Sequence, residues 1–135
     1  MQNPTILYID DDFSSLSGRE ALLKMQGYDV LITTSSTQGL SLFMSVPVDG
    51  VILDYEMPEM NGDVLARRMK SANPDIPIML LSAHDTLPDR ALEAADVFVS
   101  KSEAPTNFCR AVNDLLTHAP FFPRWLREWQ HHAAA

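Results

Sequence analysis

Short apolar runs alternate with amphipathic stretches along most of the 135-residue chain. The apolar runs predict five strands, at residues 5–9, 28–32, 48–53, 76–81 and 97–99. Apolar positions at i, i+3 and i+4 predict helices between and after them, at about residues 14–26 and 36–45, from after Gly62 to about residue 72, within 86–95, and from Pro105 through Leu116. This alternation is typical of βα units around a parallel sheet, so we expect an α/β fold.

Glycine and proline predict where several helices begin and end. Gly27 ends the first helix, the Asn73-Pro74 pair ends the third, and Pro105 is a first-turn proline of the last. Pro88 interrupts the start of the fourth helix, which is therefore expected to be short. The apolar helix positions expected to pack on the sheet are Leu16, Leu22, Leu23, Met25, Leu40, Phe43, Met44, Leu65, Met69, Phe108, Val112, Leu115 and Leu116.

The third apolar run ends abruptly at Asp54. Pro58 and Gly62 then predict a loop, so a buried strand would deliver this carboxylate to an edge of the sheet. An aspartate that merely begins a turn is the structural alternative.

Polar groups also follow other strands. Asp10 and Asp11 follow the first, Ser82 the fourth and Lys101 the fifth. Ligands of an open parallel sheet bind outside these carboxyl ends. Clustered carboxylates favour a bound cation, and oxygen ligands suit Mg²⁺. A lysine and a hydroxyl beside them would stabilise a phosphoryl group attacked by Asp54. Individually, each group also fits a capping or turn role.

Four motifs in this order resemble the receiver domains of bacterial response regulators in two-component signalling. They are Ile9-Asp10-Asp11, the stretch from Leu53 to Gly62, Ser82-Ala83 and Ser100-Lys101. The resemblance covers about residues 5–118. It implies a flavodoxin-like, doubly wound sheet of five parallel strands in the order 2-1-3-4-5, with helices on both faces.

The same resemblance implies roles for individual residues. Asp54 would be the phosphoacceptor for a histidine kinase, and Ser82 and Lys101 would contact the phosphoryl group. Asp11, Asp54 and the backbone carbonyl of Glu56 would bind Mg²⁺, with Asp10 acting mostly through water. Ser82 and Phe98 would form the conformational switch. Glu56 and His84 would flank the path of water to the phosphoryl group.

The chain departs from the family pattern in two places. Ser102 follows Lys101 where the family commonly has proline, so the usual cis peptide bond is not assumed. The segment from Ser82 to Lys101 is shorter than usual by most of a helical turn, which leaves open the fourth helix and the face by which many receivers dimerise or bind targets. Asp12 makes it ambiguous which two of the three consecutive acids belong to the site. We favour Asp10 and Asp11, because they directly follow the strand.

Composition narrows the function. A net charge of −8 argues against direct nucleic-acid binding. No apolar run is long enough to span a membrane and no signal peptide is recognised, which predicts a cytoplasmic location. The lone Cys109 is expected to be a small core or half-buried residue and is assigned no chemistry. We expect one receiver domain over residues 1–118.

Residues 119–135 have a different composition. Phe121, Phe122, Trp125, Leu126 and Trp129 include both tryptophans of the chain. We expect this C-terminal extension to be helical from Pro123, with Trp125 and Trp129 on one face. It would pack back on the domain, contact a partner or form a homodimer, or begin a further output module.

We interpret the chain as a phosphorylated signalling receiver and not an enzyme. Its partners would be a sensor histidine kinase or phosphotransfer protein and an output partner that the sequence does not identify. One alternative is a phosphohydrolase resembling the haloacid dehalogenase superfamily, because Asp10-Asp11-Asp12 follows a strand. Phe13 and the lack of later paired acids speak against it. Another is a degenerate receiver that binds partners without phosphorylation.

Overall fold

The computed structural model describes residues 3–118. These form five strands and five helices that alternate along the chain. The strands are β1 (Thr5–Ile9), β2 (Asp29–Thr33), β3 (Gly50–Asp54), β4 (Ile78–Ser82) and β5 (Val97–Ser100). The helices are α1 (Phe13–Met25), α2 (Ser36–Ser45), α3 (Gly62–Ala72), α4 (Asp89–Leu92) and α5 (Pro105–His118).

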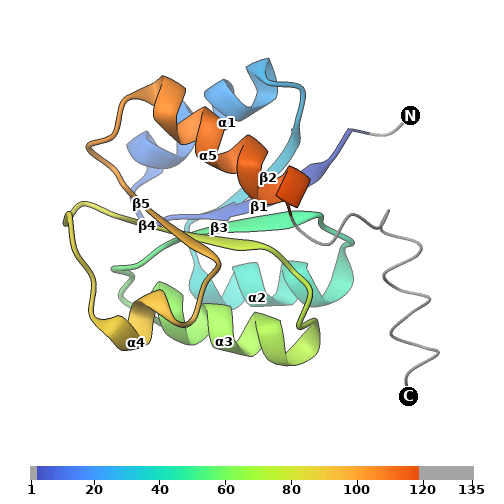
Figure 1. Ribbon diagram of the computed structural model, residues 1–135. Helices are drawn as coiled ribbons and strands as arrows, with labels where there is room; N and C mark the ends of the chain where they lie inside the picture. Colours follow the sequence, from blue (N-terminus) through green and yellow to red (C-terminus); the bar gives the residue numbers. More distant parts are fainter. Residues whose placement is uncertain (1–2, 119–135) are drawn as a thin grey trace.

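All strand pairs are parallel and the sheet order is β2-β1-β3-β4-β5, as predicted. Figure 1 shows α1 and α5 on one face of the sheet and α2, α3 and α4 on the other. Each face packs its own apolar core, and β3 and β4 are buried along their whole length. Burial on both faces explains why these strands read as continuous apolar runs.

Two glycines are required by the backbone. Gly27 follows α1 with a φ of +94°, the left-handed conformation that commonly ends helices. At Gly62, a Cβ atom would lie 2.3 Å from the backbone oxygen of Asp54. Gly62 therefore lets the loop after β3 return close to the candidate phosphoacceptor.

Some details differ from the sequence expectations. Met25 and Met44 do not pack on the sheet. They are 80% and 65% exposed, because each lies on the solvent side of its helix. The fourth helix is short, as the position of Pro88 predicts, since α4 has four residues and begins directly after Pro88. No helix in residues 3–118 is long and apolar enough to cross a membrane. The expected helix after Pro123 lies outside the described residues.

Candidate functional site

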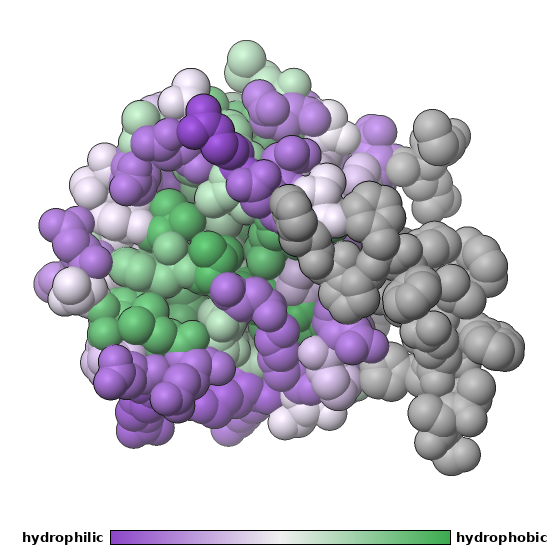
Figure 2. All heavy atoms as spheres, in the orientation of Figure 1, coloured by the Kyte–Doolittle hydropathy of each residue, from purple (hydrophilic) through white to green (hydrophobic). Residues whose placement is uncertain are grey.

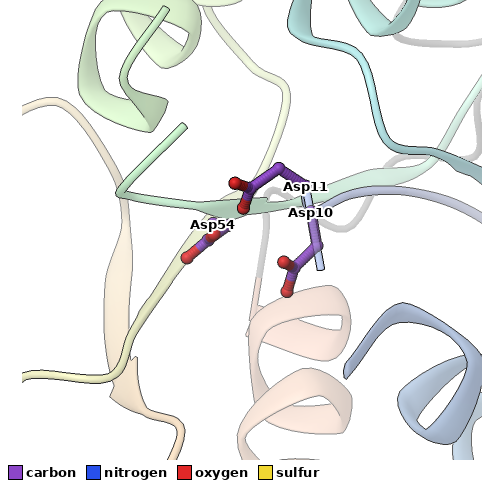
Figure 3. A group of neighbouring side chains, drawn as sticks. All are labelled: Asp10, Asp11 and Asp54. Carbon is purple, nitrogen blue, oxygen red and sulfur yellow. The ribbon is translucent and has the colours of Figure 1, made fainter. Parts of the chain in front are cut away.

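Three carboxylates meet at the carboxyl ends of β1 and β3. Asp10 and Asp11 directly follow β1, and Asp54 is the last residue of β3. Each offers an oxygen atom, and these atoms lie within 4.8 Å of one another (Figure 3). Asp10 and Asp54 are buried, whereas Asp11 is exposed. Parallel strands bring these groups together because their carboxyl ends share one edge of the sheet.

Asp10 is held by three donors. Its Oδ2 atom accepts a hydrogen bond from the Tyr8 hydroxyl at 2.9 Å and lies 2.9 Å from the Lys101 ammonium. Its Oδ1 atom accepts a bond from the backbone N–H of Asp12 at 3.0 Å. These contacts engage both carboxylate oxygens of Asp10.

Asp12 has a different role from its two neighbours. Its side chain accepts a hydrogen bond from the backbone N–H of Ser14 and caps the N-terminus of α1. The geometry therefore favours Asp10 and Asp11 as the site pair and gives the capping function to Asp12.

Asp54 has an oxygen atom without a hydrogen bond. The residue is 3% exposed, and its buried Oδ1 atom has no hydrogen-bond partner. The Lys101 ammonium lies 3.3 Å from this atom as an ion pair. Burial, together with the negative charge of Asp10, raises the pKa of the Asp54 carboxyl to about 8 despite the opposing effect of Lys101. The metal-free site thus disfavours the ionised form of its own central carboxylate.

Lys101 follows β5 and lies between two acids. Burial by itself lowers the pKa of its ammonium, but hydrogen bonding and attraction to Asp10, and then Asp54, outweigh burial and raise it. The ammonium therefore stays charged. It contacts two of the three carboxylates and leaves an excess of negative charge at the edge of the sheet.

The cluster suits a hard divalent cation. Its donors are carboxylate oxygens, one of them is buried without a hydrogen bond, and Asp11 is open to solvent. Mg²⁺ prefers oxygen ligands and keeps several waters. The residues present therefore fit Mg²⁺.

Ser82, at the end of β4, is fully buried and hydrogen-bonded to Glu56. The Ser82 hydroxyl donates to Glu56 Oε1 at 2.7 Å and accepts from the backbone N–H of His84 at 3.1 Å. His84 Nε2 lies 3.6 Å from the same Glu56 oxygen. The structure thus brings Ser82, Glu56 and His84 together near the carboxyl ends of the neighbouring strands β3 and β4, and in this state the hydroxyl of Ser82 is engaged by Glu56.

Phe98 lies on β5 and is half-buried. It pairs in register with Leu80 and packs against the core on the α2–α4 side of the sheet. Lys101 is positioned in part by its backbone, since its N–H donates to the Ser82 carbonyl at 2.7 Å. No peptide bond in residues 3–118 is cis, the bond between Lys101 and Ser102 included.

The sequence reasoning missed Tyr8 and Arg19. Tyr8 is fully buried and donates to Asp10. Burial, and then the negative charge of Asp10, raise the pKa of the Tyr8 hydroxyl, so it remains a donor. Arg19 of α1 donates to the Lys101 carbonyl at 3.3 Å and lies over the Phe108 ring. The sequence contains a signal for Tyr8: residues two apart along a strand share a face, and Tyr8 lies two residues before Asp10.

We expect Tyr8→Phe to lower the free energy of unfolding by about 1–3 kcal/mol, because a buried carboxylate loses a donor. Tyr28→Phe is the matched control, since the Tyr28 hydroxyl bonds Asn113 at 3.4 Å at the surface. Urea unfolding of both variants measures the difference. Equal losses in the two variants would contradict the importance of the Tyr8–Asp10 bond.

Comparison with known proteins identifies the family of this chain. The family model "Response regulator receiver domain" matches residues 6–113. The chain belongs to this family. It is therefore a receiver domain of the two-component response regulators. This family match is evidence against the alternative of a phosphohydrolase resembling the haloacid dehalogenase superfamily.

Relatives and solved structures agree with the family assignment. The response regulator SaeR of Staphylococcus aureus (strain USA300) is 34% identical over 116 residues, which are 83% of this chain and 50% of SaeR. The chain thus spans about half the length of this relative. TrrA of Thermotoga maritima, solved in complex with Mg(2+)-BeF, is 30% identical with a TM-score of 0.79, covering 83% of this chain and 98% of TrrA.

A CheY-like receiver domain protein from Methanospirillum hungatei JF-1 shares the fold. Its TM-score is 0.80 at 23% identity, covering 85% of this chain and 94% of that protein. This likeness supports the sheet order and the placement of the helices, and it carries no argument about the site.

Proposed function

We propose that this receiver is phosphorylated on Asp54 by a sensor histidine kinase or a phosphotransfer protein, with Mg²⁺ at the acidic cluster. Phosphorylation would change the surface that the domain presents to an output partner, and the domain would not turn over a substrate of its own. A cytoplasmic location is part of the proposal. The observation that carries it is the buried Asp54 oxygen without a hydrogen bond, next to Asp10, Asp11 and Lys101.

In this proposal, Asp11, Asp54 and the backbone carbonyl of Glu56 hold Mg²⁺, and Asp10 acts through water. The bound ion screens the negative charge of the incoming phosphoryl group. An Asp54 carboxylate oxygen forms a bond to phosphorus while the phosphorus–nitrogen bond of the donor histidine breaks, and the leaving imidazole nitrogen takes up a proton. The Lys101 ammonium, already 3.3 Å from Asp54, stabilises the phosphoryl oxygens.

The Ser82 hydroxyl has to leave Glu56 to reach the phosphoryl group. Glu56 Oε1 now accepts its hydrogen bond at 2.7 Å, so the switch exchanges one acceptor for another. We propose that movement of Ser82 vacates space into which Phe98 rotates, and that this coupling is steric because Phe98 has no hydroxyl. Phe98 rotamers in structures with and without beryllofluoride test this step.

Intact mass spectrometry tests the phosphorylation itself. After incubation with acetyl phosphate or phosphoramidate and Mg²⁺, we expect the mass of one added phosphoryl group. Asp54→Asn and removal of Mg²⁺ should each abolish the addition, whereas Asp63→Asn, a change at another buried aspartate, should keep it. Addition that survives Asp54→Asn would reject the assignment. No addition to the wild type would favour a degenerate receiver.

Glu56 and His84 are expected to set how long the phosphoryl group lasts. Glu56 places negative charge beside the site and discourages an attacking hydroxide. The phosphorylated Glu56→Ala variant should therefore lose its phosphoryl group a few-fold faster than the wild type. We propose that His84 orients water, so the phosphorylated His84→Ala variant should lose its phosphoryl group more slowly. Dephosphorylation rates of the wild type and both variants, measured across pH, check this. Unchanged rates would leave both side chains without a kinetic role.

A further inference from the structure

The outer edge of β5 carries a groove that no helix of the described chain covers. β5 is the last strand of the sheet and pairs only with β4 among the described strands. The groove has a volume of about 620 Å³ and runs between β5 and α5. It is lined by Val97, Phe98 and Val99 of the strand and by one face of the helix, namely Asn107, Arg110, Ala111 and Asp114.

The short α4 leaves this edge open. Only four residues long, α4 is held against α3, where the Arg67 guanidinium donates to the Arg90 carbonyl. As a result, Val97 and Phe98 are only half-buried. Figure 2 shows an apolar area rimmed by polar residues on this side of the molecule, between the positions of α5 and α4 in Figure 1. An edge strand with apolar flanks tends to be covered in a stable protein.

We propose that the C-terminal segment of this chain, residues 119–135, occupies the β5–α5 groove. The segment brings Phe121, Phe122, Trp125, Leu126 and Trp129, the apolar side chains that such a groove would bury. The described chain also ends close to the groove. Asp114 lines the groove and lies one helical turn before the end of α5 at His118.

Charge supports the same occupant. The groove lining includes three acids, Asp85, Glu103 and Asp114, and one base, Arg110. The segment carries Arg124 and Arg127 against the single acid Glu128. The acidic rim and the basic, aromatic segment are therefore complementary. A second groove, on the α1 side of α5, is lined by Leu22, Pro105 and Cys109 together with polar side chains, and no acid lines it.

Tryptophan fluorescence of the full chain tests the proposal, because the only two tryptophans, Trp125 and Trp129, both lie in the segment. The folded chain should show blue-shifted emission and several-fold lower acrylamide quenching than the urea-unfolded chain, at every protein concentration. Ala111→Arg, which places a long charged side chain in the groove, should shift the emission back toward the unfolded value while circular dichroism shows a folded domain. Leu22→Lys, in the groove on the α1 side, is the matched control and should leave the emission unchanged.

Hydrogen exchange supplies a second measurement that does not depend on Ala111→Arg. A full chain with Trp125→Ser and Trp129→Ser should exchange the amides of Val97–Ser100 several-fold faster than the wild type, with the β3 amides unchanged. Solvent-exposed tryptophan emission in the wild type would overturn the proposal. A blue shift that appears only when sedimentation shows dimers would also overturn it, because the segment would then bind a second copy. An emission that changes with Leu22→Lys but not with Ala111→Arg would overturn it as well.

Discussion

Replacing Lys101 with methionine is expected to lower the free energy of unfolding of the metal-free protein by about 3 kcal/mol. The Lys101 ammonium lies 2.9 Å from Asp10 and 3.3 Å from Asp54, and both of these aspartates are buried. Methionine keeps an unbranched apolar side chain but removes the charge. The buried Asp10 carboxylate then loses its ammonium partner beside Asp54, and removal of one member of a buried ion pair costs more than the pair contributes.

Urea unfolding at neutral pH with a chelator measures this loss. Lys70→Met is the matched control, because Lys70 pairs with Asp96 at 2.7 Å in a much more exposed position and should lose only about 1 kcal/mol or less. Mg²⁺ should restore part of the stability of Lys101→Met, since a bound cation also neutralises the cluster. If Lys101→Met were as stable as the wild type, Lys101 would not be neutralising the cluster.

Asp54→Asn is expected to stabilise the metal-free protein, by on the order of 2 kcal/mol at pH 8. The pKa of Asp54 is raised in the folded state, to about 8 from its usual 3.8, first by burial and then by Asp10. Between these two values the folded protein binds more protons at Asp54 than the unfolded chain does. The contribution of Asp54 to stability is therefore greatest below pH 3.8 and is lost as the pH rises toward 8. Asparagine does not titrate, so this loss disappears.

The measurement is the difference in unfolding free energy between variant and wild type from pH 5 to pH 9, a range that spans the raised pKa of about 8. The difference should grow with pH in the chelator, and Mg²⁺ should stabilise the wild type more than the variant. Asp63→Asn is a control of opposite sign, because Asp63 is a buried aspartate paired with Arg67 at 3.2 Å and its loss should destabilise the protein. A difference that shrinks as the pH rises would contradict the burial of a charge at Asp54.

The predicted sheet order, sequence of elements and family were confirmed by the structure and the comparisons. The strands could be predicted because β3 and β4 are buried on both faces and consist of apolar residues almost throughout. The approximate bounds of helix α3 could be predicted because Gly62 and the Asn73-Pro74 pair bound an apolar stripe. Local chemistry was sufficient for these elements.

The order of residue types was also sufficient to predict that polar groups follow four of the strands, and parallel strands necessarily bring such groups to one edge of the sheet. The contacts among these groups, in contrast, depend on tertiary packing. The Tyr8–Asp10 bond, the engagement of Ser82 by Glu56 and the capping role of Asp12 depend on side-chain directions that residue spacing does not specify. The exposure of Met25 and Met44 depends likewise on how the helices pack, because an apolar side chain is buried only where a neighbouring element covers it.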